Sequence, residues 1–227
     1  RFGIDGFRID TARHVNPEFW QAFVPAMQQR ALARGIPNFH IFGEVFREGV
    51  DPGQLAVFHA RDRFPALLDF TFQEVMARIV GGDGPTELAE RLFEGDWFYG
   101  DGTNGALGLP TFTGNHDMGR LSGLIRARRP DISQDELLRR VMLGNAMMFA
   151  SRGSPTIYYG DEQGFVSDGN DQAARETMFA SRTASYLDND LIGTDRTHAS
   201  AQFDPAHPLY RQIAELARLR AAYPALR

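Results

Sequence analysis

The stretch GFRIDTARHV, residues 6–15, has the apolar character of a strand but carries two charged side chains. Phe7 and Ile9 favour a buried β-strand, and Arg8 and Asp10 stand two residues apart within it. Residues two apart on a strand point to the same face, so this spacing predicts an arginine–aspartate ion pair. Charges are costly to bury without a partner. A chemical role of this pair would explain why two charges stand in an apolar strand.

Further apolar stretches follow at intervals of roughly 30–45 residues, which is room for one strand, one crossover helix and two loops. We expect strands over residues 3–10, 39–46, 66–72, 108–115 and 154–160. Apolar strands that alternate with helices predict a parallel sheet. The pattern fits either a doubly wound sheet or part of a (β/α)₈ barrel, and the absence of glycine-rich phosphate-binding motifs argues against nucleotide binding.

Helix signals lie between these strands. Asn16 and Pro17 predict a helix start, with Asn16 as the cap, and Gly35 predicts its end. The residues expected on the inner side of this helix are Phe19, Phe23, Met27 and Leu32. Further helices are expected over residues 52–61, 73–80, 86–94, 135–150 and 207–222. The segment 161–206 is long and irregular, and such loops are more often functional than accidental.

Composition limits the function classes. The chain has 227 residues, of which 43% are hydrophobic, and a formal net charge of −5, with acidic and basic residues interspersed. This argues against a nucleic-acid-binding surface, which would cluster lysine and arginine. Cysteine is absent, which excludes disulfides and cysteine metal sites. No apolar run is long enough for a membrane span. We expect one domain over residues 1–227 and no second domain.

Polar residues stand where the predicted strands end. Asp10 ends the first strand, Glu44 the second, and His116 and Asp117 the fourth. In a parallel α/β fold these ends lie on one rim, where catalytic groups are found. Each residue alone also fits a turn, a helix cap or a structural hydrogen-bonded pair. Their joint position at successive strand ends favours a catalytic site.

Three of these stretches carry a resemblance. GFRIDTARHV, FGEVF and FTGNHD resemble three consecutive signature regions of the α-amylase superfamily, glycoside hydrolase family 13, and GSPTIYYGDE at residues 153–162 resembles a fourth. The resemblance runs over nearly the whole chain, and it implies a (β/α)₈ barrel in which these motifs belong to strands 4, 5, 7 and 8. We therefore expect the chain to be the C-terminal part of such a barrel, from strand 4 to the final helix, without strands 1–3.

The resemblance also implies roles for the site residues. Asp10 is expected to be the nucleophile, Glu44 the proton donor and Asp117 a third acid that holds sugar hydroxyls. His116 is expected to hydrogen-bond the same sugar. Arg8 is expected to keep Asp10 ionised, because a nearby positive charge favours the carboxylate. An apolar neighbourhood is expected to raise the pKa of Glu44.

Arg13 and His14 resemble the pair that lines the leaving-group side in α-amylases. The main-chain carbonyl of that histidine often helps to bind calcium in the family, so calcium is the one cofactor expected, with no organic cofactor. Asp168, Asn170 and Asp171 are rich in oxygen and could suit a hard cation, but a plain loop is the favoured interpretation. Aromatic residues that could stack on glucose rings are Phe46, Trp97, Tyr99, Tyr158 and Tyr159, of which the last two are expected to pack instead.

The resemblance predicts an α-amylase-like retaining hydrolase of α-1,4-glucans, located outside the cell or in the periplasm. The alternatives within the superfamily are an α-1,6-debranching enzyme, a glucanotransferase and a maltose isomerase. A catalytically inactive relative that serves as a binding subunit is disfavoured because all three carboxylates are present. The sequence does not specify an oligomeric state.

Overall fold

The computed structural model describes residues 3–100 and 103–226 and shows five short parallel strands joined by helices. The strands are β1 (Gly6–Ile9), β2 (His40–Gly43), β3 (Ala66–Leu67), β4 (Pro110–Thr111) and β5 (Ser154–Pro155). One sheet has the order β1-β2-β3 and the other pairs β4 with β5, in both cases parallel. The amide of Asp69 donates to the carbonyl of Pro110 at 3.0 Å and joins the two sheets. The strands therefore follow one another in chain order, which fits a barrel and not a doubly wound sheet.

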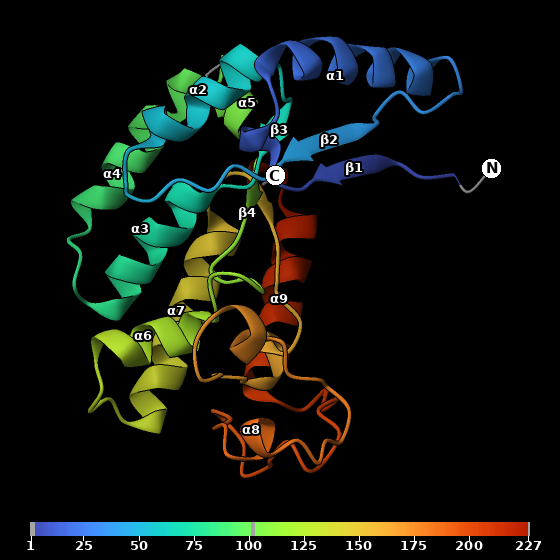
Figure 1. Cartoon of the computed structure of the whole chain (residues 1–227). Helices are drawn as coiled ribbons and strands as arrows, with labels where there is room; N and C mark the ends of the chain where they lie inside the picture. Colours follow the sequence, from blue (N-terminus) through green and yellow to red (C-terminus); the bar gives the residue numbers. More distant parts are fainter. Residues whose placement is uncertain (1–2, 101–102, 227) are drawn as a thin grey trace.

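Helices connect the strands. The α-helices are α1 (Pro17–Leu32), α2 (Pro52–Asp62), α3 (Phe70–Gly81), α4 (Glu87–Glu94), α5 (Thr103–Ala106), α6 (Leu121–Arg128), α7 (Gln134–Ala150), α8 (Ala184–Leu187) and α9 (Pro208–Ala222). Short 3₁₀ turns are η1 (Ala12–His14), η2 (Gly95–Tyr99), η3 (Asp161–Gln163), η4 (Asp171–Ala174) and η5 (Pro224–Leu226). Parallel strands separated by helices confirm the α/β class (Figure 1).

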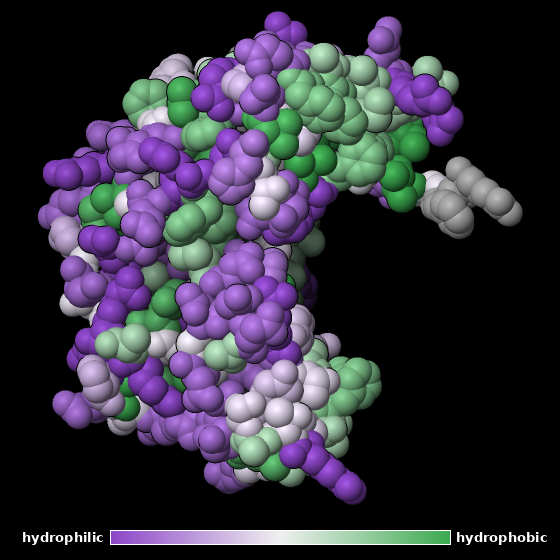
Figure 2. Space-filling view, in the orientation of Figure 1, coloured by the Kyte–Doolittle hydropathy of each residue, from purple (hydrophilic) through white to green (hydrophobic). Residues whose placement is uncertain are grey.

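The molecule is curved, with the helices α2, α3, α4 and α6 on its convex side (Figure 1). Figure 2 shows the opposite side hollowed between the arm that carries α1 and β1 and the arm formed by the segment after β5. An apolar cavity of about 370 Å³ lies between β1 and α1, and Phe7, Met27 and Phe39 are among the residues that line it. Within the described residues, β1 pairs with β2 alone, and its other edge is open on this side.

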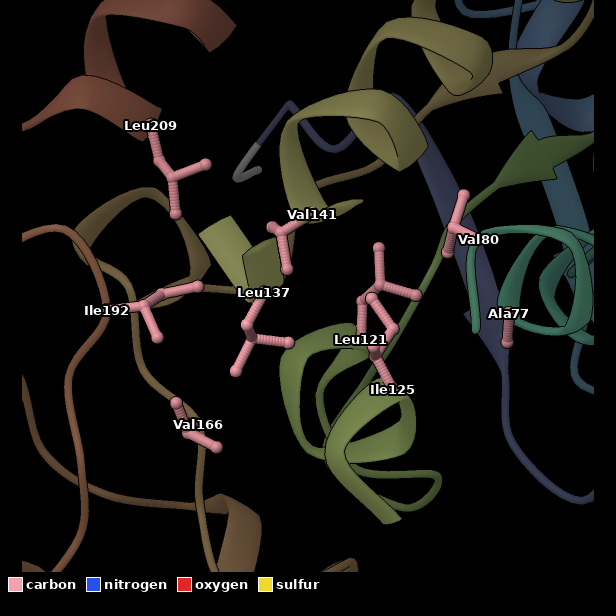
Figure 3. Packing of buried hydrophobic residues seen from close by; sticks show 9 residues of the cluster. All are labelled: Ala77, Val80, Leu121, Ile125, Leu137, Val141, Val166, Ile192 and Leu209. Carbon is pink, nitrogen blue, oxygen red and sulfur yellow. The ribbon is translucent and has the colours of Figure 1, made fainter. Parts of the chain in front are cut away.

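The core is divided into clusters. The one shown in Figure 3 joins α3, α6, α7 and α9 to the loops after β5. Its buried residues are Ala77, Val80, Leu121, Ile125, Leu137, Val141, Val166, Ile192 and Leu209. A second cluster packs α1 and α2 against the first sheet through Trp20, Val24, Ile41, Leu55 and Phe64. These helix-on-sheet contacts fix the strands whose ends carry the candidate site.

The expected strand positions are confirmed, but the strands are shorter than expected. The clearest error is the stretch 66–72, because Asp69 accepts a hydrogen bond from the Phe72 amide at 2.9 Å and caps α3, which begins at Phe70. A short carboxylate at this position satisfies an otherwise unpaired helix amide. Helix α6 was not anticipated from the sequence. The expected helices 52–61, 86–94, 135–150 and 207–222 are found to within one or two residues.

Helix α1 occupies its predicted place, with two differences in detail. Asn16 precedes it, but its side chain makes no capping hydrogen bond. Phe19 and Leu32 are exposed and not on the inner side, whereas Trp20 and Val24 are buried. The indole of Trp20 donates to the carbonyl of Ala12 at 2.9 Å and ties the helix to the turn that follows β1. Phe23 and Met27 are partly buried and pack against the second cluster, as expected.

The prediction that the β1 stretch is buried is wrong. Its residues are only partly covered, and the side chains of Arg8 and Asp10 are 37% and 64% exposed. The reason is that β1 pairs with β2 alone and forms the edge of its sheet. Among the described helices, none is long and apolar enough to cross a membrane.

Candidate active site

Asp10 and Glu44 leave adjacent strands side by side. Ile9 of β1 is in register with Gly43 of β2, so the next residue of each strand emerges at the same end. The Glu44 amide donates to the Ile9 carbonyl at 2.7 Å, and the Ala12 amide donates to the Glu44 carbonyl at 3.0 Å. The main-chain hydrogen bonds between the two strands thus continue past Asp10 and Glu44 and hold these residues side by side. The structure confirms that the ends of these two strands meet.

Arg8 contacts both carboxyl groups. Its Nη1 atom lies 2.9 Å from Asp10 Oδ1, which confirms the predicted ion pair, and its Nη2 atom lies 3.1 Å from Glu44 Oε2. The Glu44 side chain is 12% exposed, whereas that of Asp10 is mostly exposed. One guanidinium therefore bridges an exposed carboxyl group and a buried one.

The two carboxyl groups are shifted in opposite directions. A hydrogen bond with Glu44, and then the hydrogen bond from Arg8, lower the pKa of Asp10. Burial, and then the same hydrogen bond with Asp10, raise the pKa of Glu44. The pair therefore favours an ionised Asp10 that accepts a hydrogen bond from a protonated Glu44. Carboxyl groups separated in this way suit a nucleophile and a general acid.

Asp117 sits in a tight turn after β4. The Asn115 side chain accepts hydrogen bonds from the amides of Asp117 and Met118 at 2.9 and 2.7 Å. Asn115 and Gly119 also exchange two main-chain hydrogen bonds of 3.0 Å across the turn. Asparagine is suited to such a turn because its side chain can bond to the main chain two residues ahead. The turn fixes the direction in which His116 and Asp117 leave the strand.

His116 and Asp117 contact each other, with His116 Nε2 3.1 Å from Asp117 Oδ2. Both are about 40% exposed. His116 is also among the groups that lower the pKa of Asp10, though the smallest of them. The structure thus brings Arg8, Asp10, Glu44 and His116 together, with Asp117 attached to His116.

One contact of this site was missed from the sequence. Arg175 Nη2 lies 3.2 Å from Asp117 Oδ1 and 2.7 Å from Asp171 Oδ1. Arg175 belongs to the irregular segment 161–206, in which no periodic pattern marks a position. The four-residue spacing from Asp171 was the one local signal that could have indicated this pair.

Arg13 and His14 lie in η1, which follows β1. Arg13 Nη1 donates to the Phe46 carbonyl at 2.7 Å and so links this turn to the segment after β2. The His14 side chain is exposed. Over residues 3–100 and 103–226, no three side chains of His, Asp or Glu are arranged to hold a metal ion.

The oxygen-rich residues Asp168, Asn170 and Asp171 lie in a bend and in the 3₁₀ turn η4 that follows it. The Asp171 carboxylate is paired with Arg175, a positive group that a cation would have to displace. Among the aromatic candidates, Tyr99 is 2% exposed and cannot stack on a sugar, whereas Trp97 is 79% exposed. Tyr158 packs as expected, with its ring 4.6 Å from the Arg120 guanidinium carbon.

Comparison with known proteins decides the family. The family model of the α-amylase catalytic domain matches residues 1–227. The chain belongs to the α-amylase family. This confirms the resemblance carried by the sequence around Asp10, Glu44 and Asp117.

Individual relatives agree with this assignment. An α-amylase of Streptomyces lividans is 46% identical over 99% of this chain and 24% of its own length. A cyclomaltodextrinase of Geobacillus thermopakistaniensis is 27% identical over 100% of this chain and 32% of its own length. The crystal structure of an Anoxybacillus α-amylase superposes with a TM-score of 0.69 at 26% identity and covers 98% of this chain and 41% of that one. The chain thus spans about a quarter of the Streptomyces relative and a third of the Geobacillus one.

Proposed function

We propose that this α-amylase-family chain carries the catalytic groups of a retaining glycoside hydrolase that cleaves α-1,4-glucans such as starch and maltooligosaccharides. The observation that supports it most is the Arg8 bridge between Asp10 and Glu44, together with the opposite pKa shifts of the two carboxyl groups. Retention requires one ionised carboxylate and one protonated carboxyl group on either side of the scissile bond. The similarity to an α-amylase of Streptomyces lividans supports the substrate class.

The reaction then has two steps. Asp10 attacks the anomeric carbon while Glu44 transfers its proton to the departing glycosidic oxygen, which forms a glycosyl ester on Asp10. Glu44, now ionised, takes a proton from water, and this water displaces Asp10 from the sugar. Asp117, with His116 beside it, would hold sugar hydroxyls through both steps. Arg8 keeps Asp10 ionised between turnovers.

The five strands are proposed to be strands 4–8 of a (β/α)₈ barrel, with β1 as strand 4. Their parallel pairing in chain order supports this assignment. The open edge of β1 and the apolar cavity beside Phe7 fit a sheet that continues on that side. The site at the carboxyl ends of β1, β2 and β4 is where barrels of this class place catalysis.

The proposal is tested with the protein as its gene encodes it, by identifying the sugars that it releases. Amylose, pullulan, a cyclodextrin and maltose are each incubated with the protein, and proton NMR follows the first product formed. We expect cleavage of amylose with release of the α-anomer, because two inversions at one carbon restore its configuration. A first product in the β-form contradicts a glycosyl–Asp10 intermediate. Cleavage of pullulan alone favours a debranching enzyme, transfer without release of reducing sugar favours a glucanotransferase, and conversion of maltose to an isomer favours an isomerase.

A catalytically inactive binding subunit is the remaining alternative. It predicts binding of amylose without any turnover, and the Asp10→Asn variant provides the background rate against which turnover is judged. Calcium binding through the His14 carbonyl and a location outside the cell or in the periplasm remain predictions from the family resemblance. Loss of thermal stability on addition of EDTA, restored by calcium, tests the first, and fractionation of the producing cells tests the second.

A further inference from the structure

A buried ion pair joins the same two segments of the chain as the exposed pair of Arg175 and Asp117. Arg120, three residues after Asp117, and Glu176, the residue after Arg175, both have fully buried side chains. Arg120 Nη2 lies 3.2 Å from Glu176 Oε2. The same two segments thus meet twice, once in the interior and once at the candidate site.

The guanidinium of Arg120 is held on every side. It donates to Ser167 Oγ at 2.8 Å, to the Tyr159 carbonyl at 2.8 Å and to Asp161 Oδ1 at 2.7 Å. Its remaining amino group also reaches the carbonyl of Ala174 at 3.3 Å. A planar guanidinium with five donors is suited to such a junction, whereas lysine offers a single ammonium group. Arg120 therefore joins the turn after β4 to the loops after β5.

Glu176 is fixed as firmly from the other side. Its Oε1 atom accepts a hydrogen bond from Asn189 at 3.1 Å, while Oε2 faces Arg120. Along this segment Ala174 and Glu176 are buried and Arg175 between them is exposed. Holding Glu176 in the interior therefore turns Arg175 outward, toward Asp117.

The two segments also approach through their main chains. Gly119 has a φ of +86°, and a Cβ atom at this position would lie 2.7 Å from the carbonyl oxygen of Gly169. A side chain here would push the turn that carries Asp117 away from the segment that carries Arg175. An exposed ion pair has little strength of its own to set such a geometry. The buried pair and the close contact at Gly119 do so.

We propose that Arg120 and Glu176 are positioning residues, whose buried ion pair holds Arg175 against Asp117 and so sets the orientation of the third acid. The inference rests on the proposed function, in which Asp117 holds the sugar. Neither residue contacts the reacting atoms in this account. Their effect on the reaction passes through Arg175, and this makes it separable from an effect on stability.

The test compares Glu176→Gln, Arg175→Ala and the double variant in the protein as its gene encodes it. We expect Glu176→Gln and Arg175→Ala each to lower kcat on a chromogenic maltooligosaccharide about tenfold to a hundredfold, the scale of a misplaced site group, with a smaller change in KM. The double variant should be no slower than Arg175→Ala alone, because Glu176 acts through Arg175. If the factors by which the two single substitutions lower kcat multiply in the double variant, the proposal is overturned.

A matched control is available in a second buried ion pair. Arg152 precedes β5, whereas Tyr159 and Asp161 follow it, and Arg152 pairs with Asp96 at 2.8 Å and with Asp69. Asp96→Asn should lower Tm to a similar extent as Glu176→Gln but leave kcat unchanged. An equal loss of kcat in Asp96→Asn would show that instability alone explains the effect and would overturn the positioning role.

A second variant and a measurement of hydrogen–deuterium exchange test the same ion pair. If Glu176→Gln does not fold, Glu176→Asp keeps the charge on a shorter side chain and should lower kcat in part. In a protein that already carries Arg175→Ala, Glu176→Asp should lower kcat no further. Hydrogen–deuterium exchange of residues 168–176 should be faster in the Glu176 variants and unchanged in Asp96→Asn. Unchanged exchange in the Glu176 variants would contradict the ion pair as a clamp. A wild-type protein without turnover would instead contradict the proposed function. Hydrogen–deuterium exchange needs no substrate, so it tests the role of the ion pair separately.

Discussion

The Nη2 atom of Arg8 lies 3.1 Å from Glu44 Oε2, so a guanidinium on one strand reaches the carboxyl group at the end of the next. The sequence indicated the contact of Arg8 with Asp10 alone, two residues along the same strand. The second contact changes what Arg8 is expected to do. Its positive charge lowers the pKa of Glu44 as well as that of Asp10, although burial outweighs it at Glu44.

Replacement of Arg8 by alanine should therefore move the whole pH–activity profile toward higher pH. The pKa of Asp10 rises, which shifts the acidic limb of kcat/KM, and the pKa of Glu44 rises, which shifts the basic limb. Arg8→Lys should restore the charge but not both contacts, and so give a partial return. The measurement is a full pH profile of kcat/KM, with circular dichroism as the control for folding. Limbs of a folded Arg8→Ala protein at the wild-type pH would show that the bridge is structural.

The exposure of Asp10 also limits the effect of Arg8 on stability. Since the Asp10 carboxylate faces solvent, water can replace the guanidinium, and breaking an exposed pair costs about 0–1 kcal/mol. Arg8→Ala should thus lower Tm by no more than a few degrees. Thermal unfolding followed by circular dichroism measures this. A loss of folding in Arg8→Ala would mean that Arg8 contributes to the core and not chiefly to the site.

The two carboxyl groups should be separable by kinetics. In the proposed mechanism, Asp10→Asn removes the nucleophile, and Glu44→Gln removes the proton donor, a contribution of about 10²–10⁴ in kcat. A substrate with a good leaving group needs no proton from Glu44 in the first step, so it should rescue the first step in Glu44→Gln but not in Asp10→Asn. Rates with a maltooligosaccharide and with an α-maltosyl fluoride provide the comparison. Rescue of both variants to the same degree would argue against these separate roles.

Asp161 should make folding stability depend on pH. Burial raises its pKa to about 6, although Arg120 lies 2.7 Å away and opposes the shift. The folded protein therefore binds a proton that the unfolded chain has released, and its stability falls as pH rises from about 4 to about 6. Asp161→Asn should flatten this part of the curve of unfolding free energy against pH, measured by urea denaturation. An identical slope in wild type and variant would refute the buried proton.

The pairing of Asp10 with Glu44 could be predicted because it depends on one local rule. Two parallel strands in register deliver their following residues to the same edge, and the polar residues after 6–9 and 40–43 were visible in the sequence. The exposure of β1 could not be predicted in the same way. An apolar strand has the same sequence whether one or both of its edges are paired, so the open edge beside Phe7 left no local trace.

The contact of Arg175 with Asp117 was beyond local rules for another reason. Its position depends on Glu176 and Arg120, which are 56 residues apart and meet only when the segment after β5 folds back on α6. The error at residues 66–72 has a local cause instead. Asp69 ends the strand by capping α3, and an apolar run on both sides of it concealed the boundary.

The proposed covalent bond between Asp10 and the sugar can be trapped on the enzyme and located by mass spectrometry. In Glu44→Gln, α-maltosyl fluoride can glycosylate the enzyme because fluoride leaves without a proton, but water is no longer activated to release the sugar. Trypsin then yields residues 9–13, in which Asp10 is the one carboxylate side chain, for mass spectrometry. We predict that this peptide gains the mass of one maltosyl group and that the Asp10→Asn/Glu44→Gln protein shows no gain. A maltosyl group on any other peptide, or release of β-maltose from the fluoride with no labelled peptide, would contradict the assignment of Asp10 as the nucleophile.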